Sequence, residues 1–211
     1  TIIYGLIFGA IALGTIVGWL TAKRVQMTKM PELVSLFNGM GGACAALIGL
    51  VEFHHNLDNS TNIAIILAGM IIGSVSFSGS IIAWAKLNGT LRNAIRLPKY
   101  NILNTIILIG LVVYSVFIVW SGTHSEAHLY GLFTAAIIYG ILFVIPIGGA
   151  DMPVVISLLN SFTGLAAAFG GFLYGNQVML TGGILVGSAG TLLTLVMCEA
   201  MNRPLFNVIF G

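Results

Sequence analysis

The chain has 211 residues, of which 58 % are hydrophobic and only 7 % are charged, with a formal net charge of +2. Soluble domains typically contain about 25 % charged residues, so a water-soluble globular fold is excluded. The apolar residues occur in runs of about 20, the length that a helix needs to cross a bilayer. The short alternating segments of a membrane β-barrel are absent from the sequence. The sequence therefore predicts an all-α membrane protein.

Seven such runs predict seven transmembrane helices in one transmembrane domain, residues 1–211. The predicted spans are 2–22, 33–53, 63–85, 102–120, 129–148, 153–174 and 178–200. The chain opens with Thr1 directly before a span and ends soon after the last one. We therefore expect it to be a fragment of a longer polypeptide.

The basic residues predict the orientation of the spans. All eight lie after the first, third or seventh span: Lys23, Arg24, Lys29, Lys86, Arg92, Arg96, Lys99 and Arg203. With seven spans these segments share one face, which the positive-inside rule places in the cytoplasm or matrix. We expect a multi-pass protein of the inner (cytoplasmic or mitochondrial) membrane, with the N-terminus of the fragment outside and its C-terminus on the cytoplasmic or matrix side.

An internal repeat relates the first three spans to the last three. Residues 30–49 match residues 152–171 at nine of 20 positions. Four spans separate the two copies of each helix, so the copies run in the same direction, as parallel repeats. Repeats of this kind often place a functional path at their interface. Inherited packing without a path is the alternative.

Small residues indicate where helices pack closely. Gly69 with Gly73, and Gly183 with Gly187, have the Gly-x-x-x-Gly spacing that lets helix backbones approach in lipid. We expect the Gly- and Ala-rich spans to form the centre of the bundle, namely 33–53, 63–85, 153–174 and 178–200. We expect 2–22 and 102–120, which are rich in bulky aliphatic residues, to face lipid.

Polar side chains inside the spans are the candidates for function. Each of the two asparagines at matching repeat positions lies about 10 Å in from the inner end of its span, where an amide needs hydrogen-bond partners. Two serines lie one turn away on the same faces, and two more lie near the middle of the returning spans. The six candidates are Asn38, Asn160, Ser35, Ser157, Ser74 and Ser188. We expect a polar column that holds water and relays protons.

Two other points bear on this column. Polar side chains that only join helices are the alternative. In addition, no span has a His, Lys, Arg, Asp or Glu residue near its centre. If the chain moves protons, the titrating group therefore lies at the membrane edge or on another chain.

Charged residues gather at the inner membrane edge. Asp151 precedes the span 153–174, and Glu199 and Arg203 lie at the end of the last span. They indicate either an exposed ion network, which contributes little energy, or a relay to a soluble domain after Arg203. The sequence shows no phosphate loop, dinucleotide fingerprint or Cys/His metal spacing. We expect no catalytic residue, bound cofactor or metal in this chain, and no nucleic-acid partner.

Three stretches resemble the membrane part of the beta subunit of proton-translocating NAD(P)+ transhydrogenase. They are residues 22–34, residues 149–161 with their Gly-Ala-Asp-Met-Pro motif, and residues 187–203 with Gly-Ser-Ala-Gly and Met-Asn-Arg. The resemblance covers essentially the whole chain. It implies that protons entering from outside drive hydride transfer from NADH to NADP+. The NAD(H) and NADP(H) domains lie outside this chain; we expect the NADP(H)-binding one after residue 211, and about two further spans before residue 1.

The resemblance also implies roles for residues and partners. Asn160 matches an asparagine important for proton movement, and Asp151 and Arg203 match residues that couple to the NADP(H) domain. Gly187 and Gly190 match a close-packed helix that leads into that domain. Many relatives have a membrane-embedded histidine at the position of Asn38. The asparagine of this chain cannot titrate. We therefore expect membrane helices of the alpha subunit to supply a histidine. The resemblance separately implies that the assembly is a homodimer.

Two functions of other classes stay open. A small-solute or ion transporter would need a substrate-sized cavity and helices broken at the midplane, but Pro146, near the inner end of its span, is the only interruption in the sequence. A purely structural anchor has no need of paired asparagines inside the membrane.

Overall fold

The computed structural model describes residues 2–55, 59–91, 99–122 and 125–210, and every regular element in these ranges is helical. Arg92 and Arg96 lie outside the described residues. Seven of the described helices are long and apolar enough to cross a membrane. They are α1 (Ile2–Arg24), α2 (Met30–His55), α3 (Ser60–Leu87), α4 (Tyr100–Ser121), α5 (Glu126–Val144), α6 (Met152–Leu173) and α7 (Gln177–Ala200). The predicted seven-helix, all-α fold is confirmed.

Short helical segments flank three of these helices. The 3₁₀ helices η1 (Met27–Lys29) and η2 (Gly149–Asp151) precede α2 and α6, and α8 (Leu205–Phe210) follows α7. Local signals set several boundaries. Asn59 and Asn176 cap α3 and α7 by accepting hydrogen bonds from backbone N–H groups of the first turn. Pro153 stands in the first turn of α6, where its missing N–H has no intrahelical partner to lose.

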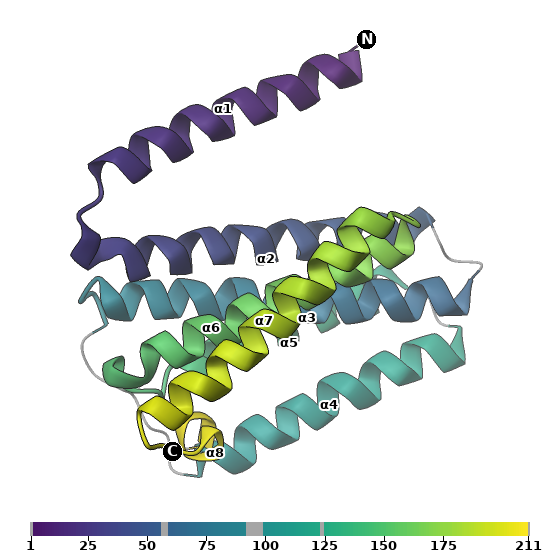
Figure 1. The fold of residues 1–211 in the computed structure, drawn as a ribbon. Helices are drawn as coiled ribbons and strands as arrows, with labels where there is room; N and C mark the ends of the chain where they lie inside the picture. Colours follow the sequence, from purple (N-terminus) through teal and green to yellow (C-terminus); the bar gives the residue numbers. More distant parts are fainter. Residues whose placement is uncertain (1, 56–58, 92–98, 123–124, 211) are drawn as a thin grey trace.

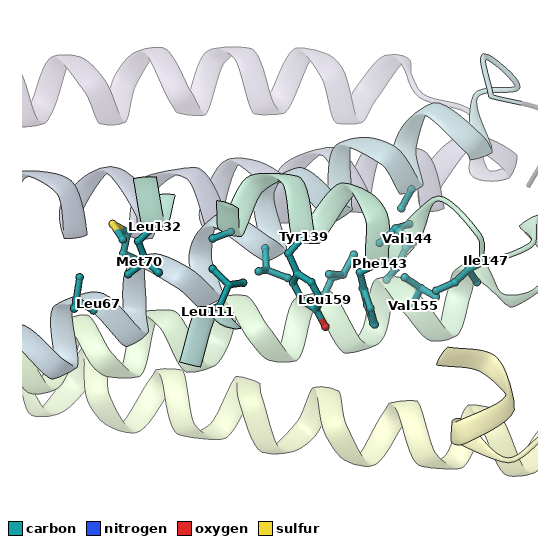
Figure 2. Close-up of a cluster of buried hydrophobic side chains, with 14 of the residues drawn as sticks. Leu67, Met70, Leu111, Leu132, Tyr139, Phe143, Val144, Ile147, Val155 and Leu159 are labelled. Atoms are coloured by element: carbon teal, nitrogen blue, oxygen red, sulfur yellow. The ribbon is translucent and has the colours of Figure 1, made fainter. Parts of the chain in front are cut away.

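The centre of the bundle is α3, which packs against α2, α4, α5 and α6. The apolar core follows α3, α5 and α6 and includes Leu67, Tyr139 and Leu159, and α4 adds Leu111 (Figure 2). In contrast, α1 has no buried residue and stands apart from the other helices (Figure 1). The low burial of α1 and α4 leaves both outside the bundle centre, and their contact with lipid stays a prediction.

The prediction that 178–200 lies in the bundle centre is wrong within this chain. Among the described helices, the extended contacts of α7 are with α6, and most of its side chains are exposed. The reason is that one glycine-lined face of α7 meets α6, while its other faces present aliphatic side chains such as Leu185 and Leu192. Instead, α5 occupies the centre, where Leu132 and Ala136 are fully buried.

The sequence repeat is also a structural repeat. Both α2 and α6 begin at the same end of the bundle, and α3 and α7 return to it (Figure 1, left). We call this the basic end, because it holds Lys23, Arg24, Lys29, Lys86, Lys99 and Arg203. A Cβ built on Gly42 would lie 2.8 Å from the carbonyl oxygen of Gly73, and one on Gly164 would lie 2.7 Å from the nitrogen of Gly187. Matching glycine pairs therefore bring α2 against α3 and α6 against α7 at backbone distance.

Candidate functional site

A buried cluster of amide and hydroxyl groups lies where α2, α3 and α6 meet. Asn38 Nδ2 donates to Ser80 Oγ at 2.9 Å and to Ser76 Oγ at 3.4 Å. Ser35 Oγ, one turn before Asn38, donates to the carbonyl oxygen of Ser80 at 2.8 Å. Ser76 Oγ lies 2.5 Å from Thr163 Oγ1 of α6. We call these five residues the polar cluster. It connects both halves of the repeat through hydrogen bonds.

One atom of the polar cluster lacks a partner among the described residues. Asn38 is 8 % exposed, and its Oδ1 is buried with no hydrogen bond. The neighbouring hydroxyls can donate or accept, so exchanging the amide O and N would leave Nδ2 unpaired in the same place. An unpaired buried polar atom costs about 1–3 kcal/mol. The cluster therefore contains one buried acceptor that the described residues leave without a hydrogen bond.

A cavity of about 220 Å³ extends from the polar cluster toward the end of the bundle opposite the basic end. It lies between α2, α3 and α6, and small residues such as Gly41, Ala45 and Ala166 line it. Thr163 adds its hydroxyl to this lining and bonds Ser76 at the same time. Since one water in the liquid occupies about 30 Å³, the cavity has room for several waters that reach the polar cluster.

A polar contact joins α2 and α6 at the end of the bundle opposite the basic end. Tyr174, just after α6, donates from its hydroxyl to Glu52 Oε1 in the last turn of α2 at 2.8 Å. Burial and the neighbouring Glu52 carboxylate both raise the pKa of Tyr174. Leu173, the residue before it, lines the cavity.

At the basic end, the structure joins two of the predicted residues in an ion pair. Asp151 is 9 % exposed, and Arg203 Nη1 contacts its Oδ1 at 2.9 Å and its Oδ2 at 2.8 Å. A cavity of about 400 Å³ adjoins the pair and is also lined by Tyr100 and Asn207. Glu199 is exposed and lines a separate hollow together with Arg203.

The other predicted path residues do not join the polar cluster. Ser74 Oγ donates to the carbonyl oxygen of Met70, one turn earlier on its own helix, at 2.6 Å. Ser157 Oγ donates across to the carbonyl oxygen of Gly190 at 3.1 Å. Ser188 is exposed on α7. Of the six predicted residues, only Ser35 and Asn38 lie in the cluster.

Asn160 differs from its repeat counterpart. Asn38 points toward α3, whereas Asn160 is exposed on the surface of this chain. Its neighbours explain the difference: Leu159 faces the core and Ser161 faces α7, where its Oγ donates to the carbonyl oxygen of Gly187 at 2.6 Å. Asn160 is therefore available to a group outside this chain.

The predicted glycines of α7 lie where this helix crosses α6. A Cβ on Gly183 would lie 2.5 Å from the nitrogen of Ala168, and one on Gly190 would lie 3.0 Å from Ser161. Gly187 is the backbone partner of Gly164 described above. At Gly183 a larger side chain would force the helices apart, whereas a Cβ on Gly187 would meet only the side chain of Leu165 at 3.3 Å.

Sequence reasoning missed Ser76, Ser80 and Thr163. The serines at 74, 76, 78 and 80 alternate along α3, and alternate residues of a helix point in different directions. Ser76 and Ser80, however, are one turn apart and share a face, as Ser35 and Asn38 nearly do. Pairing these two polar faces would have identified the cluster.

These features define a class of protein: a multi-pass helical membrane protein with parallel repeats and a hydrogen-bonded polar cluster between them. A family described as NAD(P) transhydrogenase beta subunit matches residues 1–211, and the chain belongs to this family. Two curated relatives, both NAD(P) transhydrogenase subunit beta of Rhodospirillum rubrum, are 39 % identical to the chain over 218 residues, which cover 99 % of this chain and 47 % of each relative. The chain thus spans about half the length of these relatives. The resemblance seen in the motifs is confirmed.

Proposed function

We propose that this chain is the proton-translocating membrane domain of an NAD(P)+ transhydrogenase. In this proposal, inward proton movement drives hydride transfer from NADH to NADP+ in soluble domains that bind NAD(H) and NADP(H). Membership of the beta-subunit family supports the reaction. The observation that supports a proton path in this chain is the polar cluster, with the unpaired Oδ1 of Asn38.

The proposed path begins at the end opposite the basic end. Water in the 220 Å³ cavity would reach Thr163, whose hydroxyl continues through Ser76 to Asn38. Hydrogen-bonded hydroxyl groups and water let a proton pass along the chain of bonds, and the Asn38 amide, which donates from Nδ2, orients them. They avoid leaving an isolated charge in the apolar core, which would be very costly.

A partner would supply the titrating group. None of the five polar cluster residues ionises near neutral pH, so the cluster can conduct but cannot store a proton. We propose that a membrane helix of the alpha subunit places a histidine where it faces the exposed Asn160. Histidine suits this role because its charge changes near physiological pH. The complete assembly would be a homodimer.

The basic end would lie on the cytoplasmic or matrix side, because positively charged loops stay on that side. The Asp151–Arg203 pair and Glu199 would then couple the path to the NADP(H) domain that follows in the longer chain. In support, Arg203 follows α7 directly and binds the segment that precedes α6.

Proton pumping by the full assembly in sealed vesicles tests the path. We expect Thr163→Val, which replaces a hydroxyl with a methyl group of similar size, to lower NADPH-driven pumping by about tenfold or more, equivalent to ~1.4 kcal/mol in the barrier. Thr105→Val is the matched control, because Thr105 is exposed on α4 and bonds only its own helix. Wild-type pumping by Thr163→Val would remove the cavity and Thr163 from the path.

The cavity gives little support to the small-solute alternative. Ligand pockets usually measure about 300–1,000 Å³ and converge several polar groups on the ligand. This cavity is smaller, about 220 Å³, and its lining is mainly apolar.

A further inference from the structure

Lys86, in the last turn of α3, binds the carbonyl end of α5. Its Nζ donates to the carbonyl oxygens of Val144 at 3.0 Å, Ile145 at 2.5 Å and Ile147 at 2.6 Å. An ammonium group has three N–H donors, and all three are used here. A lysine that served only to orient the chain in the membrane would leave its ammonium in water, so these contacts indicate a structural role.

The end of α5 needs such a cation. The last carbonyl groups of a helix have no intrahelical partner, and Pro146 prevents the helix from continuing because it lacks an N–H. A positive charge at this end is also favoured by the helix dipole. The buried Asn104 of α4 assists by donating to the carbonyl oxygen of Leu142 at 3.4 Å.

The segment that Lys86 holds leads directly to Asp151. Ile147 is buried, and its N–H donates to the carbonyl oxygen of Val144 at 3.2 Å. The N–H of Asp151 donates to Gly148 at 3.1 Å, which forms the next turn. Ile147, Gly148 and Asp151 all line the 400 Å³ cavity beside the ion pair. Lys86 thus fixes the segment from which Asp151 reaches Arg203.

The same helix reaches the polar cluster. Ser80 precedes Lys86 by six residues, which is about 9 Å along α3. A movement of α3 at the polar cluster is therefore transmitted to the carbonyl end of α5. Because the contact consists of three hydrogen bonds from one charged group, it is short and stiff compared with apolar packing.

We propose that Lys86 is a positioning residue for the Asp151–Arg203 ion pair. Its ammonium binds the start of the segment 144–151. The position of Asp151 therefore depends on the position of α3. The consequence for proton coupling rests on the proposed function. The claim about the position of Asp151 does not.

The first test measures that position in the full assembly, in inverted membrane vesicles. Ala150 is exposed next to Asp151, so Ala150→Cys in a background with Cys44→Ser and Cys198→Ala reports on the segment through its rate of reaction with an impermeant maleimide. We expect Lys86→Met to change this rate by about fivefold or more, and Lys86→Arg to stay within about twofold of wild type. Lys29→Met, at an exposed lysine of the same end, is the control. An unchanged rate in Lys86→Met would overturn the proposal.

The second test is a double-mutant cycle on the coupled transhydrogenation rate. If Lys86 acts through Asp151, the double variant Lys86→Met with Asp151→Asn will be as slow as the slower single variant, within about twofold. Multiplied effects would mean that Lys86 acts separately, and would overturn the proposal. Should Lys86→Met not accumulate in the membrane, Lys86→Gln, which lacks the charge, takes its place in both tests.

The two tests distinguish failure of this inference from failure of the proposed function. If Thr163→Val pumps normally while the maleimide rate responds to Lys86→Met, the path is wrong and the positioning role stands. If Thr163→Val abolishes pumping while the maleimide rate ignores Lys86→Met, the path stands and the positioning role is wrong.

Discussion

Replacing Asn38 by leucine separates a proton path from polar adhesion between helices. Leucine has the same branched arrangement of four side-chain heavy atoms as asparagine, although it is larger, and it has no hydrogen-bonding side-chain atom. If Asn38 mainly joins α2 to α3, its removal loosens the helix pair. If it holds the path, its removal blocks protons while the helix pair stays intact.

The structure predicts a small effect on stability. Asn38→Leu removes two hydrogen bonds, at 2.9 and 3.4 Å, and such bonds contribute on average about 0.6 kcal/mol each in membrane proteins. It also removes the unpaired Oδ1, whose burial costs about 1–3 kcal/mol. This gain offsets the loss of the two bonds and of the partner of the buried Ser80 hydroxyl, so we expect the free energy of unfolding to change by less than about 2 kcal/mol. The backbone contact between Gly42 and Gly73 still holds the helices together.

The assay combines thermal unfolding of the purified assembly with proton pumping in vesicles. We expect Asn38→Leu to unfold within a few degrees of wild type, because about 1 kcal/mol shifts the midpoint by about 2–4 °C in a protein of this size. We expect its pumping to fall by about tenfold or more. Asn38→His, whose ring nitrogens can donate and accept, should retain pumping. A leucine variant that pumps normally but unfolds far below wild type would refute the path and establish adhesion.

Three further predictions follow from the packing and the surface. Gly183→Ala should lower the unfolding free energy by about 1–3 kcal/mol, since its Cβ would lie 2.5 Å from a backbone nitrogen of α6; Gly182→Ala, where nothing lies within 4 Å, is the control, and equal melting of the two variants would contradict the packing argument. Asp151→Asn should weaken coupling and alter NADP(H) release, because it discharges the partner of Arg203; normal pumping and release would leave the ion pair with a structural role only. Asn160→Ala should leave the unfolding temperature unchanged, because the side chain is exposed, yet lower NADPH-driven pumping; unchanged pumping would remove Asn160 from the path.

The number of helices and the direction of the repeat were predictable because they depend on local or countable features. Apolar runs set the spans, and the lysines and arginines mark one end. Which helices lie at the centre was not predictable in the same way. A glycine stripe such as that of Gly183 and Gly187 shows that α7 has one close partner, but the other faces of α7 resemble those of α5 in apolarity. Contacts between helices that are distant in the sequence decide that α5, and not α7, packs against α3.

The site was predictable only where a residue is unusual for its surroundings. An asparagine in an apolar span indicates a special environment, and Asn38 has one. A serine is less informative, because its hydroxyl can bond the carbonyl one turn earlier on the same helix, as Ser74 does. Ser76 and Ser80 face α6 and α2 instead, and only the tertiary packing distinguishes them from Ser74.

The separation of α1 from the other helices has a consequence for biogenesis. A helix that is apolar along its length inserts into the bilayer on its own, and lateral association of inserted helices is a later step. For α2 to α7, the glycine contacts and the core within this chain guide that step. For α1, which buries no residue here, lateral placement is left to whatever surrounds the chain. The place of α1 is thus set by contacts that α2 to α7 do not provide.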